Sequence, residues 1–456
     1  MTTREALAEK HTLIEPQPGP QTQFLQSSAD IVFYGGSAGG GKTYALLLEC
    51  LYDINNPAFG AVIFRRTTKQ VTSEGGLWDT AVDLYSPLGA TPNQNDLALK
   101  FKTGAKVTFA HMEHEKNRLD WQGSQIPLIG FDEITHFSWK QFSYMISRNR
   151  STSGAKSRMR GTCNPDPDSW VRRFIDWWID DDGFAITERS GVVRYFVIEG
   201  DDVIWADDPE LLTKENPKRR PKSFTFIRSS IEDNKILLES DPDYLANLQA
   251  LPRVERAQLM DGNWNIRPTA GSYFQRSDFE VVDAAPSAAK TVRAWDQAGT
   301  EKKKRDSDDP DWTVGFKMAR AKDGTIYCLG MERFRVDASK VDQRIQNTAS
   351  QDGRGVSIRL AQDPGQAGKS QARHQTRMLA GYTVRAKPVS GDKLTRAKPF
   401  ASQVQAGNVK VVRGDWNEAF FSELESFPDG AHDDIVDAAS DAFDELTENK
   451  KRAGVW

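Results

Sequence analysis

The sequence predicts an α/β protein with at least two domains, and three observations support this prediction. First, 456 residues are too many for one ordinary hydrophobic core. Second, residues 29–165 alternate short apolar runs with helical stretches, as in a mostly parallel sheet that helices cover on both faces. Third, new apolar runs begin after Gly271. We therefore expect domains at residues 1–165 and 271–456, joined by a smaller lid or linker subdomain at residues 166–270.

The composition is that of a globular chain without membrane or disulfide features. Hydrophobic residues make up 38%, charged residues 27%, and the formal net charge is −4. No apolar run approaches the roughly 18–20 residues that span a bilayer, and the N-terminus lacks the apolar stretch of a signal peptide. Cys50, Cys163 and Cys328 show no paired spacing, which excludes a disulfide scaffold or a Cys-based zinc site and fits a reducing cytosol.

A phosphate-binding loop follows the first predicted strand. Five apolar runs are expected to be strands of the first domain: residues 31–34, 61–64, 107–110, 126–131 and 159–162. Between the first strand and a helical run stands Gly-Ser-Ala-Gly-Gly-Gly-Lys-Thr, the pattern of Gly, four residues, Gly, Lys and Ser or Thr. A Gly-rich turn without a ligand is the weaker interpretation. The expected nucleotide contacts are Gly36, Ser37, Ala38, Gly39, Gly40, Gly41, Lys42 and Thr43. Backbone N–H groups would hold phosphates, Lys42 would reach the β- and γ-phosphates, and Thr43 would ligate Mg²⁺.

The strand at residues 126–131 supplies the acidic partner of this loop, because it ends in Asp132 and Glu133. We expect Asp132 to hold Mg²⁺ through water and Glu133 to polarise the water that attacks the γ-phosphate. Loop and acidic strand together predict a P-loop NTPase domain of the ASCE type. Thr162 and Asn164 follow the strand at residues 159–162, where they could sense the γ-phosphate; an Asn-Pro turn after a strand is the alternative.

Carboxylates mark a second site in the other half of the chain. The expected strands are residues 291–295, 312–319, 325–329, 357–361 and 382–386, and the expected helices are residues 339–350 and 433–446. Asp296 and Asp363 each follow one of these strands, and Asp433 and Asp434 open the last helix. Each Asp taken alone is more often a helix cap or a solvated strand end. Their order is that of a ribonuclease-H-like site, in which two Mg²⁺ or Mn²⁺ ions activate water.

A basic segment lies between two of the proposed metal-binding elements. Residues 354–413 contain twelve Lys or Arg and two acids, a net charge of 12 − 2 = +10. Such a surface suits a DNA phosphate backbone, and a solvated basic face is the alternative. Lys369, Lys393 and Arg396 are the predicted DNA contacts. Residues 366–370, Gln-Ala-Gly-Lys-Ser, are not a second phosphate loop, because Asp363 stands where the first Gly is required.

With these motifs in order, the chain resembles the large subunit of tailed-bacteriophage terminases, the motors that package DNA. The resemblance rests on residues 35–43, 131–133, 161–165, 295–300, 362–369, 391–397 and 432–438. It implies an N-terminal ATPase with a small lid, followed by a ribonuclease-H-like nuclease. ATP hydrolysis would drive double-stranded DNA into the procapsid, and the nuclease would cut concatemeric DNA.

The resemblance also implies roles for single residues. Thr162 and Asn164 would couple hydrolysis to DNA movement. Asp296, Asp363 and Asp434, with Asp433 adjacent, would be the nuclease metal ligands. Gln21 lies in residues 20–24, which resemble the segment that recognises adenine; an N-terminal linker is the alternative.

One departure from the family concerns the arginine finger. Some terminases carry an Arg inside the phosphate loop, and no Arg lies between Gly35 and Lys42. A neighbouring subunit of a ring would then supply the finger. Arg118 is the candidate, with Arg65 and Arg66 as alternatives; each could instead be a surface or DNA-phosphate contact.

The family further implies partners, cofactors and a location. Expected are ATP, Mg²⁺ at the ATPase, Mg²⁺ or Mn²⁺ at the nuclease, double-stranded DNA, the small terminase subunit and the portal protein. The subunit would form a homo-oligomeric ring on the portal and be monomeric when free. It would act in the host cytoplasm, transiently on the procapsid, outside the mature virion. A cellular DNA-repair helicase/nuclease and a docking module with a decayed nuclease site are the alternatives.

Overall fold

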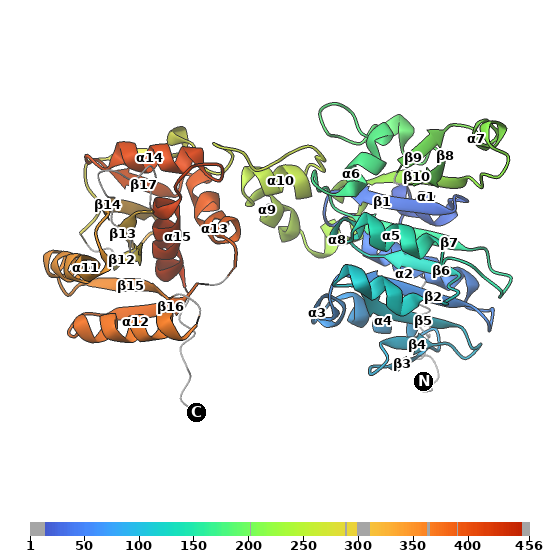
Figure 1. The fold of residues 1–456 in the computed structure, drawn as a ribbon, viewed down its shortest axis with the longest axis horizontal. Coiled ribbons are helices and arrows are strands. Elements are labelled where there is room, and N and C mark those ends of the chain that lie inside the picture. The colour runs from blue at the N-terminus through green and yellow to red at the C-terminus, as the bar shows by residue number, and fades with distance from the viewer. Residues whose placement is uncertain are drawn as a thin grey trace, which may run out of the picture. The chain divides into compact units, whose positions relative to one another are not determined.

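The computed structural model describes residues 14–200, 202–287, 290–298, 311–362, 365–389 and 391–448 (Figure 1). Two compact units are present: one is Met1–Gln249 with Glu255–Ile266, and the other is Ala250–Val254 with Arg267–Trp456. Within the described residues, no helix is long and apolar enough to cross a membrane.

The first unit is built on a ten-stranded sheet with the order β3-β4-β5-β2-β6-β7-β1-β10-β8-β9. Its strands are β1 (Ile31–Gly36), β2 (Gly60–Arg65), β3 (Thr91–Asn93), β4 (Ala98–Lys100), β5 (Lys106–His111), β6 (Leu128–Phe131), β7 (Arg158–Cys163), β8 (Arg194–Glu199), β9 (Asp202–Ala206) and β10 (Lys222–Ser229). Five of these strands, β1, β2, β5, β6 and β7, lie at the predicted apolar runs. They form a continuous parallel block together with β10.

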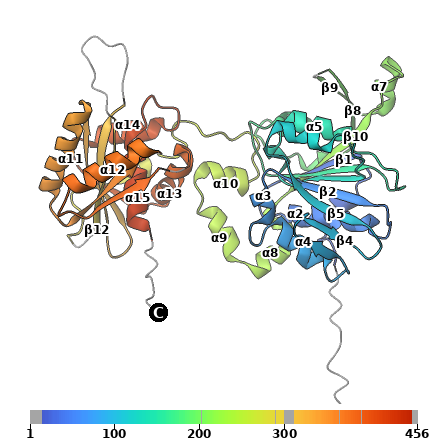
Figure 2. The same ribbon diagram turned by 60° about the horizontal axis from the view of Figure 1, so that its bottom comes forward.

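The helices of residues 20–259 are α1 (Pro20–Gln26), α2 (Lys42–Glu49), α3 (Thr68–Thr72), α4 (Leu77–Tyr85), α5 (Trp139–Ile146), α6 (Trp170–Phe174), α7 (Pro209–Glu215), α8 (Lys235–Ser240), α9 (Asp243–Gln249) and α10 (Arg253–Leu259). Figure 2 shows α2, α4 and α5 beside the sheet.

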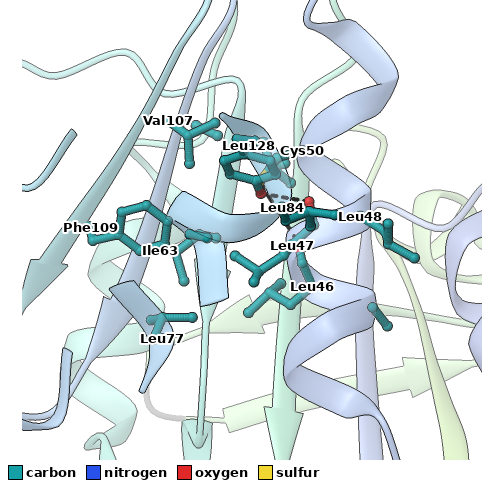
Figure 3. Packing of buried hydrophobic residues seen from close by; sticks show 14 of the residues in the cluster. Leu46, Leu47, Leu48, Cys50, Ile63, Leu77, Leu84, Val107, Phe109 and Leu128 are labelled. Atoms are coloured by element: carbon teal, nitrogen blue, oxygen red, sulfur yellow. Dashed lines mark hydrogen bonds between the residues drawn. The ribbon is translucent and has the colours of Figure 1, made fainter. Parts of the chain in front are cut away.

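The strands are buried on both faces, as the apolar runs predict. Val32 and Tyr34 of β1 belong to one core cluster, whereas Ile31 and Phe33 belong to another, because successive side chains of a strand point to opposite faces. Figure 3 shows the first cluster, in which the leucines of α2 pack near side chains such as Ile63 and Phe109. The sheet therefore holds β1, and the loop that follows it, between two hydrophobic layers.

Strand β10 comes from the segment predicted as a lid or linker. It pairs in parallel with β1, with Ile31 opposite Phe224 and Tyr34 opposite Ile227. Phe224, Phe226 and Ile227 are fully buried, so this stretch stabilises the sheet as a central strand. The first sheet thus continues well past residue 165, and the division of the chain into three parts stays a prediction.

The second unit has a seven-stranded sheet with the order β11-β17-β14-β13-β12-β15-β16. The strands are β11 (Glu280–Val282), β12 (Lys290–Asp296), β13 (Thr313–Arg320), β14 (Ile326–Phe334), β15 (Val356–Gln362), β16 (Val384–Pro388) and β17 (Val409–Val412). The helices are α11 (Ala338–Asp352), α12 (Gln366–Met378), α13 (Lys393–Gln405), α14 (Asn417–Ser426) and α15 (Asp434–Thr447). All five predicted strands are present. Strands β12 to β14 are antiparallel neighbours, whereas β15 and β16 continue the sheet in parallel.

Candidate active sites

The phosphate-binding loop joins β1 to the N-terminus of α2. Gly36 has φ 141°, and a Cβ there would lie 2.1 Å from the carbonyl oxygen of Ser229, so only glycine fits. Gly41, with φ 72°, is the N-cap of α2. The N–H groups at the start of a helix are free to bind anions. In this loop they lie beyond the carboxyl end of β1.

Lys42 is held inside this loop. Its side chain is 7% exposed, and its Nζ donates to the carbonyl oxygens of Ser37 (2.5 Å) and Gly36 (3.4 Å). Burial lowers the pKa of the Lys42 ammonium, while Glu133 is the largest of the opposing influences. The positive charge therefore faces the acidic end of β6.

Asp132 is the polar centre of the site. It is fully buried, and its Oδ1 accepts from the hydroxyls of Thr43 (2.9 Å) and Thr162 (2.6 Å). Its Oδ2 accepts from Arg65 through Nε (2.6 Å) and Nη2 (2.5 Å). The strands β2, β6, β7 and β1 are adjacent and parallel, so their carboxyl ends meet at one edge. An oxygen-only set of Asp132 and Thr43 fits the ligands that Mg²⁺ prefers.

Glu133 lies beside Asp132 in a strained conformation. Its φ of 61° and ψ of 60° are left-handed, which costs about 1–3 kcal/mol for a residue other than glycine. Its N–H donates to Thr162 Oγ1 (3.1 Å), and Asn164 Nδ2 donates to both carboxylate oxygens (3.1 and 3.2 Å). Within the described residues, no donor reaches the buried Asn164 Oδ1. The structure thus brings the predicted pair, Thr162 and Asn164, onto the two acids.

The bridging hydroxyl of Thr162 leads to a prediction. Thr162→Val is expected to lower kcat for ATP about 10- to 100-fold, because Asp132 loses a donor and the Glu133 N–H loses an acceptor. Thr162→Ser keeps the hydroxyl and should retain most of the activity. Steady-state ATP turnover of both variants checks this; equal activity of Thr162→Val and the wild type would contradict it.

The remaining residues predicted around the nucleotide lie as follows. Gln21 is close to the loop, since its Nε2 donates to the Gly41 carbonyl at 3.1 Å. Arg66 donates to the Met112 carbonyl at 3.1 Å, away from Asp132. Arg118 donates to the Glu115 carbonyl at 2.6 Å, within its own turn of 3₁₀-helix. Arg65, which the sequence analysis gave as an alternative arginine finger, contacts Asp132. Its position at the end of a predicted strand was the sequence feature that could have placed it there.

The second site lies at the ends of β12 and α15. Asp296 is the last residue of β12, and Asp434 is the first residue of α15. Asp434 Oδ2 accepts from the Trp312 N–H at 3.1 Å. Asp363 lies outside the described residues, but it follows β15, which is parallel to β12 with Trp295 opposite Leu360. The carboxyl ends of β12 and β15, which lead to Asp296 and Asp363, therefore lie side by side.

The carboxyls of this site are crowded. Burial raises the pKa of Asp296 to about 8, and the charges of Asp437, Asp434 and Asp441 act in the same direction. Burial also raises the pKa of Asp434 and of Asp437. Asp437, which was not among the predicted ligands, therefore lies close enough to Asp296 to influence its pKa. A divalent cation would offset this repulsion, so the residues fit a metal site.

One further group has metal-binding geometry in this region. Ligand atoms of Asp311, His432 and Asp434 all lie within 4.8 Å of one another. His432 Nδ1 is 3.8 Å from Asp434 Oδ2 and 3.9 Å from Asp311 Oδ1. Neither Asp311 nor His432 was predicted as a ligand, because their distance in the sequence gives no spacing signal.

Two of the three predicted DNA contacts pair with acids of the same unit. Lys393 Nζ lies 2.6 Å from Asp433 Oδ1, and Arg396 Nη2 lies 2.7 Å from Asp437 Oδ1. Other cations of residues 354–413 pair with the same helix or its cap: Arg359 with Asp441, Arg385 with Glu445, and Lys387 with Glu448. The net charge of +10 counts residues 354–413 alone. In the folded protein, acids from other segments neutralise much of this charge. Lys369 is exposed on α12.

Comparisons with known proteins cover both parts of the chain. A family model described as "Terminase large subunit, T4likevirus-type, N-terminal" matches residues 33–281, more than half of the chain. A second model, "Terminase RNaseH-like domain", matches residues 293–446. No curated protein matches the sequence.

Solved structures of the large terminase from a thermophilic bacteriophage share the fold. One crystal form has a TM-score of 0.61 and 12% identity, covering 95% of this chain and 100% of that chain. The complex of that protein with ATP-gamma-S has a TM-score of 0.57 and 13% identity, covering 94% and 99%. Since both family models describe terminases, a DNA-repair helicase/nuclease is not favoured. The chain belongs to the large-subunit family of phage terminases, in which an ATPase and an RNaseH-like nuclease act on DNA during packaging with nucleotide and divalent metal.

Proposed function

We propose that Glu133 is the general base of ATP hydrolysis and that Asn164 orients it. The observation that carries this proposal is the pair of hydrogen bonds from Asn164 Nδ2 to both oxygens of the Glu133 carboxylate. The attacking water would donate one proton to Glu133, and the buried Asn164 Oδ1 is an acceptor for its other proton. Removal of the Glu133 carboxylate tests the assignment: ATP turnover should be lost and DNA cleavage retained.

The other residues of this site have distinct proposed tasks. Thr43 and Asp132 would hold Mg²⁺, which supplies charge neutralisation at the β- and γ-phosphates when bound. Lys42 and the N–H groups of residues 36–43 bind the phosphates, and Gln21 recognises adenine. Thr162 touches both Asp132 and Glu133, so it is suited to report loss of the γ-phosphate, together with Asn164.

For the nuclease, Asp296, Asp363 and Asp434 are the proposed ligands of two Mg²⁺ or Mn²⁺ ions, with Asp433 adjacent. Bound ions supply a hydroxide nucleophile and stabilise the leaving oxygen. The crowded carboxyls of Asp296, Asp434 and Asp437 support this proposal, because oxygen donors held together against their own repulsion match hard divalent cations.

A DNA-contact surface on α12 extends the Lys369 prediction. Lys369, Arg373 and Arg377 are exposed, and their spacing of four residues places them on one face of the helix. No acid of the described chain pairs with any of the three, in contrast to Lys393 and Arg396. In the sequence, α12 begins three residues after Asp363. We therefore assign DNA-phosphate contact to this "α12 basic face", defined as Lys369, Arg373 and Arg377.

Charge reversal on the α12 basic face is expected to weaken DNA binding. The triple variant Lys369→Glu, Arg373→Glu and Arg377→Glu is expected to weaken binding of double-stranded DNA at least about tenfold and to lower the salt slope by roughly 2–3. The exposed Lys322 provides the control, since Lys322→Glu changes charge elsewhere on the unit. Fluorescence anisotropy over a salt series measures both quantities. An unchanged slope in the triple variant would remove α12 from the interface.

The assembly is proposed from the family. A homo-oligomeric ring on the portal, with the small terminase subunit as a further partner, would place Arg118 of one subunit at the nucleotide of the next. The free subunit would be monomeric, in the host cytoplasm, and would join the procapsid only during packaging. The exposed turn that carries Arg118 suits a residue that acts on a neighbouring subunit.

A further inference from the structure

Three successive carbonyl groups of the phosphate-binding loop are each bound by a side chain from a different element. The Gly39 carbonyl accepts from Asn234 Nδ2 at 2.6 Å. The Gly40 carbonyl accepts from Tyr34 Oη at 3.0 Å. The Gly41 carbonyl accepts from Gln21 Nε2 at 3.1 Å. Asn234 precedes α8, Tyr34 is in β1, and Gln21 is in α1.

These bonds determine where the next N–H groups point. A trans peptide is planar, and its C=O and N–H are directed to opposite sides. A carbonyl that is held against the surrounding protein therefore turns the N–H of the following residue toward the inside of the loop. In this way the three bonds orient the N–H groups of Gly40, Gly41 and Lys42. Glycine peptides would otherwise rotate easily, because glycine has the widest range of backbone conformations.

Asn234 is itself oriented by its neighbours. Its Oδ1 accepts from Gln17 Nε2 at 2.6 Å and from the Leu237 N–H at 3.2 Å, which caps α8. Since both donors occupy the oxygen, the amide nitrogen is the end that faces Gly39. Asn234 therefore has two separable tasks, a cap on α8 through Oδ1 and a bond to the loop through Nδ2.

Tyr34 is oriented by the core. Its side chain is fully buried and packs against Phe24, with ring centroids 5.4 Å apart. Burial raises the pKa of the phenol, so the hydroxyl keeps its proton and remains a donor at physiological pH.

We infer that Asn234 and Tyr34 are positioning residues that aim the phosphate-binding N–H groups of the loop before nucleotide arrives. Neither residue belongs to the phosphate-loop or acidic-strand motifs, and neither needs to touch the nucleotide. Their contribution is preorganisation: the loop loses less conformational freedom when the phosphates bind. The inference rests on the assignment of this loop to ATP.

The test uses full-length protein and two probes, ATP and inorganic tripolyphosphate, which lacks adenine and ribose. Tyr34→Phe and Asn234→Ser are expected to raise KM for ATP and Ki for tripolyphosphate about 5- to 10-fold each, the value of one hydrogen bond, with kcat within about twofold of the wild type. Ser at position 234 can still cap α8, so the cap is kept while the amide's bonds to the Gly39 carbonyl and to Gln17 are removed.

A matched control is Tyr85 of α4, which contacts α2, the helix that follows the loop. Tyr85 is fully buried and donates through Oη to the Leu47 carbonyl of α2 at 2.7 Å. Tyr85→Phe therefore removes the same kind of bond away from the loop and should leave both constants unchanged. Equal effects of Tyr85→Phe and Tyr34→Phe would mean that only general stability is affected, which overturns the inference.

Asn234→Ala separates the two tasks of Asn234. If Asn234→Ser binds tripolyphosphate like the wild type while Asn234→Ala does not, Asn234 acts only as a cap and the inference is wrong. Wild-type protein that binds tripolyphosphate but does not hydrolyse ATP would contradict the function proposed for Glu133 and not this one. Thermal melting of each variant identifies any that fail to fold, and Tyr34→Phe and Asn234→Ser provide independent tests.

Discussion

Glu133→Gln is expected to reduce ATP turnover by roughly 10²- to 10⁴-fold, the usual contribution of a general base. The amide has the size of the carboxylate but does not accept the proton of the attacking water. Asn164 Nδ2 donates to both carboxylate oxygens, so it keeps the bond to the one oxygen that remains at position 133 and loses the other. ATP affinity should remain within a fewfold of the wild type, and steady-state turnover combined with ATP binding measures both quantities.

Two further variants are compared with Glu133→Gln. Lys42→Ala should also abolish turnover, but through loss of phosphate binding, so its affinity for ATP falls. The exposed Glu113 provides a matched control, and Glu113→Gln should behave as the wild type. Metal-dependent DNA nicking should be intact in all three variants, since the nuclease is a separate unit. Normal hydrolysis by Glu133→Gln would assign the base to another residue.

Asp296→Asn is expected to lower metal-dependent plasmid nicking at least about 100-fold, while ATP turnover stays unchanged. The same variant should be more stable than the wild type without metal. Asp296 shares its site with the carboxyls of Asp434 and Asp437, and its pKa is raised to about 8 by burial and then by these charges. An uncharged amide removes that repulsion.

The direction of the pH dependence follows from this pKa. The unfolded chain ionises Asp296 near pH 3.9, whereas the folded chain retains the proton to about pH 8. The stability that this carboxyl contributes is fully present below about pH 4 and is lost as the pH rises to 8. Asp296→Asn should therefore exceed the wild type by roughly 5 kcal/mol at pH 8 and nearly equal it at pH 4.

Calorimetry in EDTA at the two pH values measures this difference. Asp415 is an exposed Asp of the same unit, and Asp415→Asn should show no pH-dependent gain. Added Mn²⁺ should stabilise the wild type and not Asp296→Asn. A wild type that is as stable as Asp296→Asn at pH 8 without metal would contradict the crowding of these carboxyls.

The features predicted from the sequence are those that depend on short, contiguous segments. The phosphate loop is contiguous, and the polar residues that follow β6, β7 and β12 are found from apolar runs whose carboxyl ends meet at one edge of a sheet. Arg65 and Asn234 were not predicted to contact the loop site of their own chain, because they lie far from it in the sequence and match no motif. They reach it only once β2 lies beside β6 and α8 begins beside the loop.

Charge counting along the chain leaves out partners for a related physical reason. Lys393 and Arg396 lie in a stretch rich in cations, but their partners Asp433 and Asp437 come from the start of α15. A charge count within one segment cannot include acids that folding brings from another. The cations of the α12 basic face were identified because they are exposed and no acid of the described chain pairs with them, not by the density of charge.

The place of β10 in the first sheet has a consequence for synthesis of the protein on the ribosome. Strand β1 needs β7 on one side and β10 on the other, and β10 ends at Ser229 whereas β1 ends at Gly36. At about 5–20 residues per second, roughly 10–40 s pass between the emergence of the two strands. During that interval β1, with apolar residues such as Val32 and Phe33, has at least one unpaired edge, and both edges are unpaired until β7 has emerged. The ATPase core therefore depends on protection from aggregation until the segment that follows its motifs has been made.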